Sequence, residues 1–203
     1  MTASEAAFGR RSGVLKLGIL GAVCGAISWA LVNYADDLNL KFDDERFGVV
    51  LLPISVFPGA VFGLLIGPAL ALWRRASILR GAAYAIASQI GYLAAFHATF
   101  YALGNLGQSS GSGGGPSFVD FAISGLPGGF AGSVLLGLAA KFLFPVPGYR
   151  ALVRSIVIGT AAGALLGLGA FDDHNGWGFF AFFVLWQGLY GASLAPLIGD
   201  RPR

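Results

Sequence analysis

The residues best suited to bind a small molecule gather in one apolar stretch of the chain. Tyr84, Ser88 and Tyr92 are spaced four apart, so a helix would place them on one face, with Gln89 beside it. Hydroxyl and amide groups inside an apolar bundle can line a substrate cavity, or they can form hydrogen bonds that join helices. The pattern therefore predicts either a polar cavity wall or interhelical hydrogen bonds.

The two histidines do not form a recognisable metal site. His97 has no Cys or Glu at ligand spacing, so it is either an ionisable pathway residue or a histidine near a helix end. His174 lies among Asp172, Asp173 and Asn175, but adjacent turn residues rarely converge on one ion. We expect no metal and no other cofactor.

Two proline–glycine pairs offer a different kind of site. Pro58-Gly59 and Pro127-Gly128 fall within apolar runs, where proline removes a backbone hydrogen bond. A helix broken there would free carbonyl and amide groups that can bind a substrate or an ion, whereas a simple kink would not. We expect these four residues to belong to a pathway together with the polar stretch.

Several kinds of chemistry are missing. No Asp, Glu, Lys or Arg lies in the middle of an apolar run, and the sequence has no phosphate-binding loop and no paired-carboxylate site. Ion-coupled transporters usually need such charged groups within the membrane. The single cysteine, Cys24, excludes an intrachain disulfide. We therefore expect no catalytic residue and a chain that is not an enzyme.

Composition and length then indicate the elements that must position these residues. Of the 203 residues, 56% are hydrophobic and only 11% are charged, which does not fit a soluble domain. Six apolar stretches each reach the length of about 20 residues that a membrane helix needs. They are residues 14–34, 49–73, 78–103, 118–144, 151–171 and 178–198. The sequence predicts an all-α polytopic membrane helix bundle whose first helix is not a cleaved signal peptide.

Charge predicts the orientation of the helices. With six spans, Lys41 and Arg46 are the only basic residues on one side, and most acidic residues share that side. Lys and Arg concentrate in cytoplasmic loops, so both termini are predicted to be inside. The basic balance then reflects anionic lipid, not nucleic acid. The excess of Arg over Lys, with abundant Ala and Gly, favours a multi-pass protein of a bacterial inner (plasma) membrane.

Local patterns within the stretches give further expectations. Ser117-x-x-Asp120 predicts an N-terminal helix cap, with an ion site as the alternative. Trp186 lies well inside the last stretch and could face a cavity. Small residues recur at four-residue spacing in the first two stretches: Gly21 and Gly25, Ala22 and Ala26, and Gly59, Gly63 and Gly67. Such stripes either pack helices within the chain or dock a membrane-protein partner or a second copy.

A faint threefold repeat divides the six stretches into parallel hairpins. Lys16, Arg80 and Arg154 are each followed five positions later by a small residue. In the second stretch of each hairpin, Pro58-Gly59 would align with Pro127-Gly128 and with Gln187-Gly188. Chance recurrence in a chain rich in Gly and Ala is the alternative interpretation.

Size, helix count and the stripe formed by Ala22, Ala26 and Ala30 give a resemblance to a known family. In these features the chain resembles the substrate-binding membrane subunits of energy-coupling-factor transporters. The resemblance implies capture of a vitamin or metal and an ATP-hydrolysing partner. The leading prediction is a small-molecule or ion transport or channel-like subunit without its own energy source. The alternative is a non-catalytic membrane scaffold that binds partners through its small-residue stripes.

Overall fold

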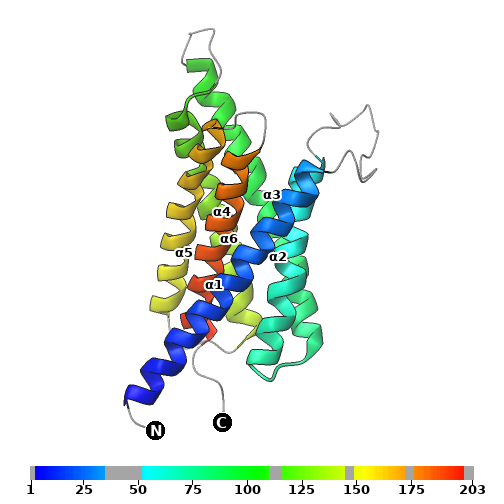
Figure 1. Cartoon of the computed structure of the whole chain (residues 1–203), viewed down its shortest axis with the longest axis vertical. Helices are drawn as coiled ribbons and strands as arrows, with labels where there is room; N and C mark the ends of the chain where they lie inside the picture. The colour runs from blue at the N-terminus through cyan, green and yellow to red at the C-terminus, as the bar shows by residue number, and fades with distance from the viewer. Residues whose placement is uncertain (1–2, 35–51, 110–115, 145–148, 172–175, 199–203) are drawn as a thin grey trace.

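The computed structural model describes residues 3–34, 52–109, 116–144, 149–171 and 176–198. Throughout these residues the structure is helical, which confirms the predicted all-α class (Figure 1). The elements are α1 (Ala3–Asn33), α2 (Leu52–Trp73), α3 (Ile78–Ser109), α4 (Phe118–Leu143), α5 (Tyr149–Gly163), the 3₁₀ segment η2 (Ala164–Phe171) and α6 (Trp177–Ile198).

Within the described residues, five helical stretches are long and apolar enough to cross a membrane. They are Ser12–Asn33, Val56–Trp73, Phe118–Leu143, Tyr149–Ala170 and Trp177–Pro196. The remaining helix, α3, is longer than any of these but carries more polar side chains. The length and composition of these helices are compatible with a multi-pass membrane protein.

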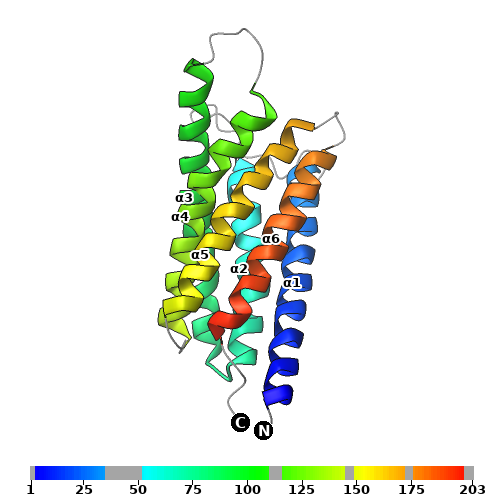
Figure 2. The same cartoon turned by 90° about the vertical axis from the view of Figure 1, so that its left-hand side faces the viewer.

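The helices form a ring in chain order. Each helix packs against the helices before and after it in the sequence, and α6 closes the ring by packing along α1. Figure 2 shows α3 and α4 on one side of the bundle and α6 and α1 on the other. Along their described lengths, the backbones of α3 and α6 do not approach each other closely, although Tyr92 of α3 meets Trp186 of α6 through their rings. The start of α1 and the end of α6 lie at the same end of the bundle.

The described basic residues gather at that same end, which we call the basic end. They lie in α1, at the α2–α3 turn and around the α4–α5 connection: Arg10, Arg11, Lys16, Arg74, Arg75, Arg80, Lys141, Arg150 and Arg154. Asp120 lies at the opposite end, which we call the far end. Lys41, Arg46 and the His174 turn fall outside the described residues.

The hydrophobic core fills the half of the bundle nearer the basic end. Ile66 and Leu70 from α2, Leu194 from α6 and Phe144 after α4 are completely buried there. Tyr84 is also completely buried, with its ring centroid 6.1 Å from that of Phe144. The bundle is therefore densely packed at the basic end, and its hollow spaces lie further toward the far end.

The small-residue stripe of α1 is used inside the chain. Gly21 and Gly25 lie directly against the backbone of α6, and a Cβ at Gly25 would lie 2.6 Å from the carbonyl carbon of Phe183. On the neighbouring face, Ala22 lies 3.4 Å from the Cβ position of Gly188. The exposed side of α1 carries larger side chains instead, namely Val14, Leu15, Ile19, Val23 and Ile27.

Small residues also bring the other helices together. On α2, Gly59, Gly63 and Gly67 face α3, and a Cβ at Gly63 would lie 2.7 Å from the Cα of Ala85. Helix α4 has two such faces, because Gly128 and Gly132 lie against α3 whereas Gly125 and Gly129 lie against α5. Because backbones touch at these glycines, side chains cannot fill the space between the helices there.

Of the two alternatives for the proline–glycine pairs, a broken helix is not found. Helix α2 continues through Pro58 and Pro68, and α4 continues through Pro127. The observed change in helical form lies elsewhere, in the fifth stretch, where α5 gives way to 3₁₀ helix at Ala164. A 3₁₀ segment within a long helix often marks strain or a hinge.

The predicted cap of α4 is confirmed. Asp120 Oδ2 accepts hydrogen bonds from the backbone N–H of Ser117 at 2.8 Å and from its hydroxyl at 2.7 Å. The Ser117 hydroxyl in turn accepts the backbone N–H of Asp120 at 3.3 Å. This reciprocal pair is a capping box, which satisfies two backbone donors at the start of the helix.

Candidate functional site

Two adjoining chambers lie inside the ring, away from the packed basic end. The inner chamber, of about 30 Å³, is lined by α2, α3, α4, α5 and α6. The outer chamber, of about 100 Å³, is lined by α3, α4, α6 and the α5–η2 segment. Both chambers share Tyr92 and Ala95 of α3, Gly129 of α4 and Trp186 of α6 as walls. Because they share these walls, the two adjoining chambers together make up the candidate site.

Aromatic rings form most of the outer chamber. Phe96, Phe100, Phe121, Phe179, Phe182 and Phe183 line it together with Tyr92 and Trp186. Trp186 stacks on Phe182 at 5.6 Å between ring centroids and lies 5.8 Å from Tyr92. Gly125, Gly128 and Gly163 also line this chamber. Glycines leave room for a ligand where side chains would otherwise fill the bundle.

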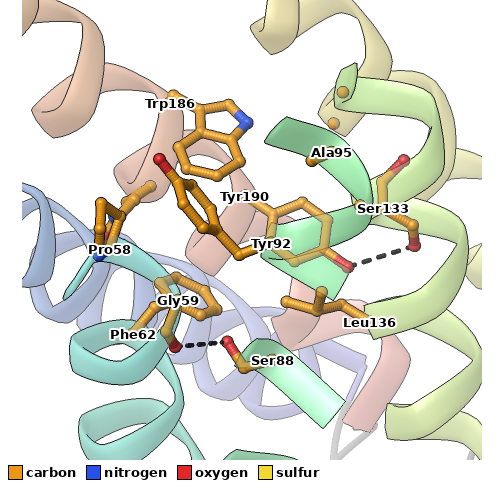
Figure 3. Close-up of a pocket in the computed structure, with 14 residues that line it drawn as sticks. Pro58, Gly59, Phe62, Ser88, Tyr92, Ala95, Ser133, Leu136, Trp186 and Tyr190 are labelled. Carbon is orange, nitrogen blue, oxygen red and sulfur yellow. Dashed lines mark hydrogen bonds between the residues drawn. The ribbon is translucent and has the colours of Figure 1, made fainter. Parts of the chain in front are cut away.

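The inner chamber carries hydroxyl groups that already have partners. The Ser88 hydroxyl donates to the Gly59 carbonyl at 2.9 Å, across the α2–α3 interface. The Tyr190 hydroxyl donates to the Ser133 carbonyl at 3.4 Å, and Figure 3 shows both bonds as dashed lines. These two hydroxyl hydrogens are therefore engaged with the backbone.

Gln187 is the polar residue of the inner chamber that is incompletely paired. Its side chain is only 1% exposed, and its Nε2 donates to the Ser28 hydroxyl at 3.2 Å. The Ser28 hydroxyl in turn donates a hydrogen bond to the Cys24 carbonyl at 2.7 Å. The Gln187 Oε1 atom is buried and has no hydrogen-bond partner among the described residues. An acceptor left in this state costs free energy until a donor reaches it.

Five of the residues predicted from sequence line these chambers. Pro58, Gly59, Ser88 and Tyr92 line the inner chamber, and Tyr92 extends into the outer chamber as well. Gly128 lines the outer chamber. The predicted face of α3 therefore does contribute a wall, although the proline–glycine pairs do so without breaking their helices.

The other four predicted residues lie elsewhere. Tyr84 is in the core toward the basic end, and Gln89 is at the α2–α3 interface against Gly59. His97 is exposed on α3, where its Nδ1 lies 2.8 Å from the Leu93 carbonyl oxygen. Pro127 is exposed on α4. These positions give none of the four a place in the chamber walls.

The sequence analysis missed four polar wall residues, Thr99, Ser133, Gln187 and Tyr190. The available signal was an amide and a phenol within the otherwise apolar range 178–198, three positions apart and so on one helical face. Trp186, which was expected to face a cavity, lines both chambers.

The electrostatics of the site favour a neutral ligand. No Asp, Glu, Lys, Arg or His is among the residues that line either chamber. Among the described residues there is also no cluster of His, Cys, Asp and Glu that could hold a metal ion. The walls can therefore offer aromatic surface, backbone dipoles, hydroxyl groups and one unpaired amide oxygen, but no formal charge.

Compared with known proteins, the chain matches no family model, no curated protein and no solved structure.

Proposed function

We propose that the chain is a membrane-embedded transport or channel-like subunit that binds a small molecule in the two chambers and has no energy source of its own. The observation that carries this proposal is a pair of adjoining apolar chambers, the inner of which is lined by Gln187 with its unpaired, buried amide oxygen. Ligand sites typically combine apolar walls with a few fixed polar groups. An ion is a weaker candidate than a neutral molecule, since no charged side chain lines the walls.

The surroundings of the chambers support access from the far end or from the bilayer. Phe100, which lines the outer chamber, is 42% exposed on the surface of α3. Helices α3 and α6, which form two of its walls, have no close backbone contact and meet through the rings of Tyr92 and Trp186. In the other direction, the completely buried side chains of Ile66, Leu70 and Leu194 close the bundle. We infer a site that is open outward and closed toward the basic end.

The topology that we propose has six membrane spans with both termini in the cytoplasm of a bacterium. Helix α3 would be the remaining span, since its 32 residues extend about 48 Å at 1.5 Å each, beyond the ~30 Å hydrocarbon core. The described Lys and Arg at the basic end support this orientation through the positive-inside rule.

We also propose that the fold consists of three parallel hairpins, α1–α2, α3–α4 and α5 with α6. The first helix of each hairpin packs on the second helix of the preceding one, through corresponding positions. The matching contacts are Gly21 with Gln187, Ala85 with Gly63, and Gly159 with Gly129. These contacts align Gly63 with Gly129, whereas the sequence pattern aligned Gly63 with Gly132. The structural register is thus shifted by three residues in α4.

The scaffold alternative has less support from the described residues. It requires a stripe of small residues that faces outward, but Gly21, Gly25, Gly59, Gly63 and Gly67 all lie against helices of the same chain. The resemblance to energy-coupling-factor transporters would allow capture of a metal, but no described feature favours it.

Native mass spectrometry of the detergent-purified protein tests the proposed function. The wild type is expected to retain a small molecule, and Ala95→Phe is expected to lose it, because Ala95 lines both chambers and a phenyl ring would occupy them. Ala82→Phe is the matched control, since Ala82 is exposed on the same helix. Equal retention by both variants would argue against the chambers as the site.

A further inference from the structure

We propose that the ligand of the chambers is a neutral molecule with a single aromatic ring that carries a hydroxyl or amino group. This inference rests on the proposed function, because it assigns a chemical class to the same site. It is argued from the charge, the size and the hydrogen-bonding capacity of the walls.

Neutrality follows from the absence of charge in the walls. An ion in such a site would lose its hydration without gaining an opposite charge, which is expensive within a membrane protein. Aromatic faces alone can attract a cation. The acidic residue adjacent to a wall residue, Asp120 beside Phe121, is held by the Ser117 amide and hydroxyl in the capping box. It is therefore committed to the helix end.

Size limits the ligand to about one ring. An engineered apolar protein cavity of about 150 Å³ binds benzene. The outer chamber, at about 100 Å³, is of that order, and its aromatic walls favour a flat, apolar guest. The inner chamber adds about 30 Å³, enough for a hydroxyl or amino substituent. A ring stacked near Trp186 would thus direct its substituent toward the inner chamber.

Hydrogen bonding then requires a donor on the ligand. The hydroxyl hydrogens of Ser88 and Tyr190 are already given to backbone carbonyls. The Gln187 Oε1 atom, in contrast, is a buried acceptor without a partner among the described residues. A ligand hydroxyl or amine that reaches this atom should bind roughly tenfold more tightly than the same ring with a methyl group.

Ligand-detected ¹⁹F NMR on the full chain in lipid nanodiscs tests the inference, with empty nanodiscs as the reference for partitioning into lipid. The probes are 4-fluorophenol and 4-fluorotoluene, which have nearly the same shape. We expect saturable binding of both, with 4-fluorophenol about tenfold tighter. Gln187→Leu should remove that difference. Gln89→Leu, an amide substitution at the α2–α3 interface outside the chambers, should preserve it.

The outcomes separate the inference from the proposed function. Equal affinities of the two probes for the wild type would overturn the donor requirement and leave the proposed function intact. Saturable binding of neither probe would overturn both. Displacement of 4-fluorophenol by tetramethylammonium would overturn neutrality in favour of a cation held by the aromatic walls. If Gln187→Leu fails to fold, the comparison of the two probes on the wild type still decides the question.

Discussion

The close contact between α1 and α6 at Gly25 gives a quantitative prediction. A Cβ at Gly25 would lie 2.6 Å from the carbonyl carbon of Phe183 and 2.7 Å from the Cα of Val184, whereas ordinary contact begins at 3.4 Å. Because these are backbone atoms, Gly25→Ala can be accommodated only if α1 and α6 move apart. Overpacking of this kind costs about 1–3 kcal/mol. The separation should also weaken the Gln187–Ser28 hydrogen bond, one helical turn away.

Denaturant unfolding in detergent, followed by tryptophan fluorescence, measures this cost. Trp29 of α1 stacks on Trp177 of α6 at 5.7 Å, so the signal reports on the same interface. Gly104→Ala is the matched control, because a Cβ there would have no heavy atom within 4 Å. Alanine should be neutral or slightly stabilising at that exposed helical position. If the two variants were equally stable, the inferred backbone contact between α1 and α6 would be wrong.

Three further predictions follow from the described contacts. Ser117→Ala should lower the free energy of unfolding by about 1 kcal/mol, because it removes the capping hydroxyl of α4; unchanged denaturation would contradict this. Trp29→Phe should cost a similar amount by removing the 2.8 Å bond from Nε1 to the Gly176 carbonyl, and an unchanged melting temperature would count against it. In a Cys24→Ala background, Ser77→Cys and Gly104→Cys place single cysteines about 40 Å apart along the helix. An impermeant maleimide should therefore label them from opposite sides of the membrane. Labelling of both from the same side would refute the proposed topology.

Much of the fold was predictable because the cost of burying peptide groups in lipid depends on length and composition alone. The range 118–144 matches α4 within one residue, and 178–198 matches α6 equally closely, whereas α1 begins well before the predicted residue 14 and α3 continues beyond the predicted residue 103. The cap at Ser117 was predictable because it is a local pattern. The change to 3₁₀ helix at Ala164 was not predictable, because the sequence there remains continuously apolar.

Which side of each helix faces the bundle interior and which faces lipid was much harder to predict. In a soluble protein, polar residues mark the side of a helix that faces water. In a membrane bundle, both the lipid-facing side and the buried side are apolar, so this signal is weak. The stripe at Gly21 and Gly25 could therefore be recognised as a packing surface, but the sequence did not say whether its partner was another molecule or α6. In the structure the stripe packs on α6, because the first and last helices lie side by side and close the ring.

The two interior glutamines show the same limit at the site itself. Gln89 attracted attention because it lies among other polar residues in α3, yet its helix packs closely on α2 there and leaves no cavity beside it. Gln187 stands alone in an apolar helix, but α6 contributes walls to both chambers, and its amide oxygen is buried at the end of the open space. An isolated amide in an apolar span is costly unless something pairs with it. An amide in an otherwise apolar helix, as at Gln187, was thus a stronger indication of a binding site than an amide among polar neighbours, as at Gln89.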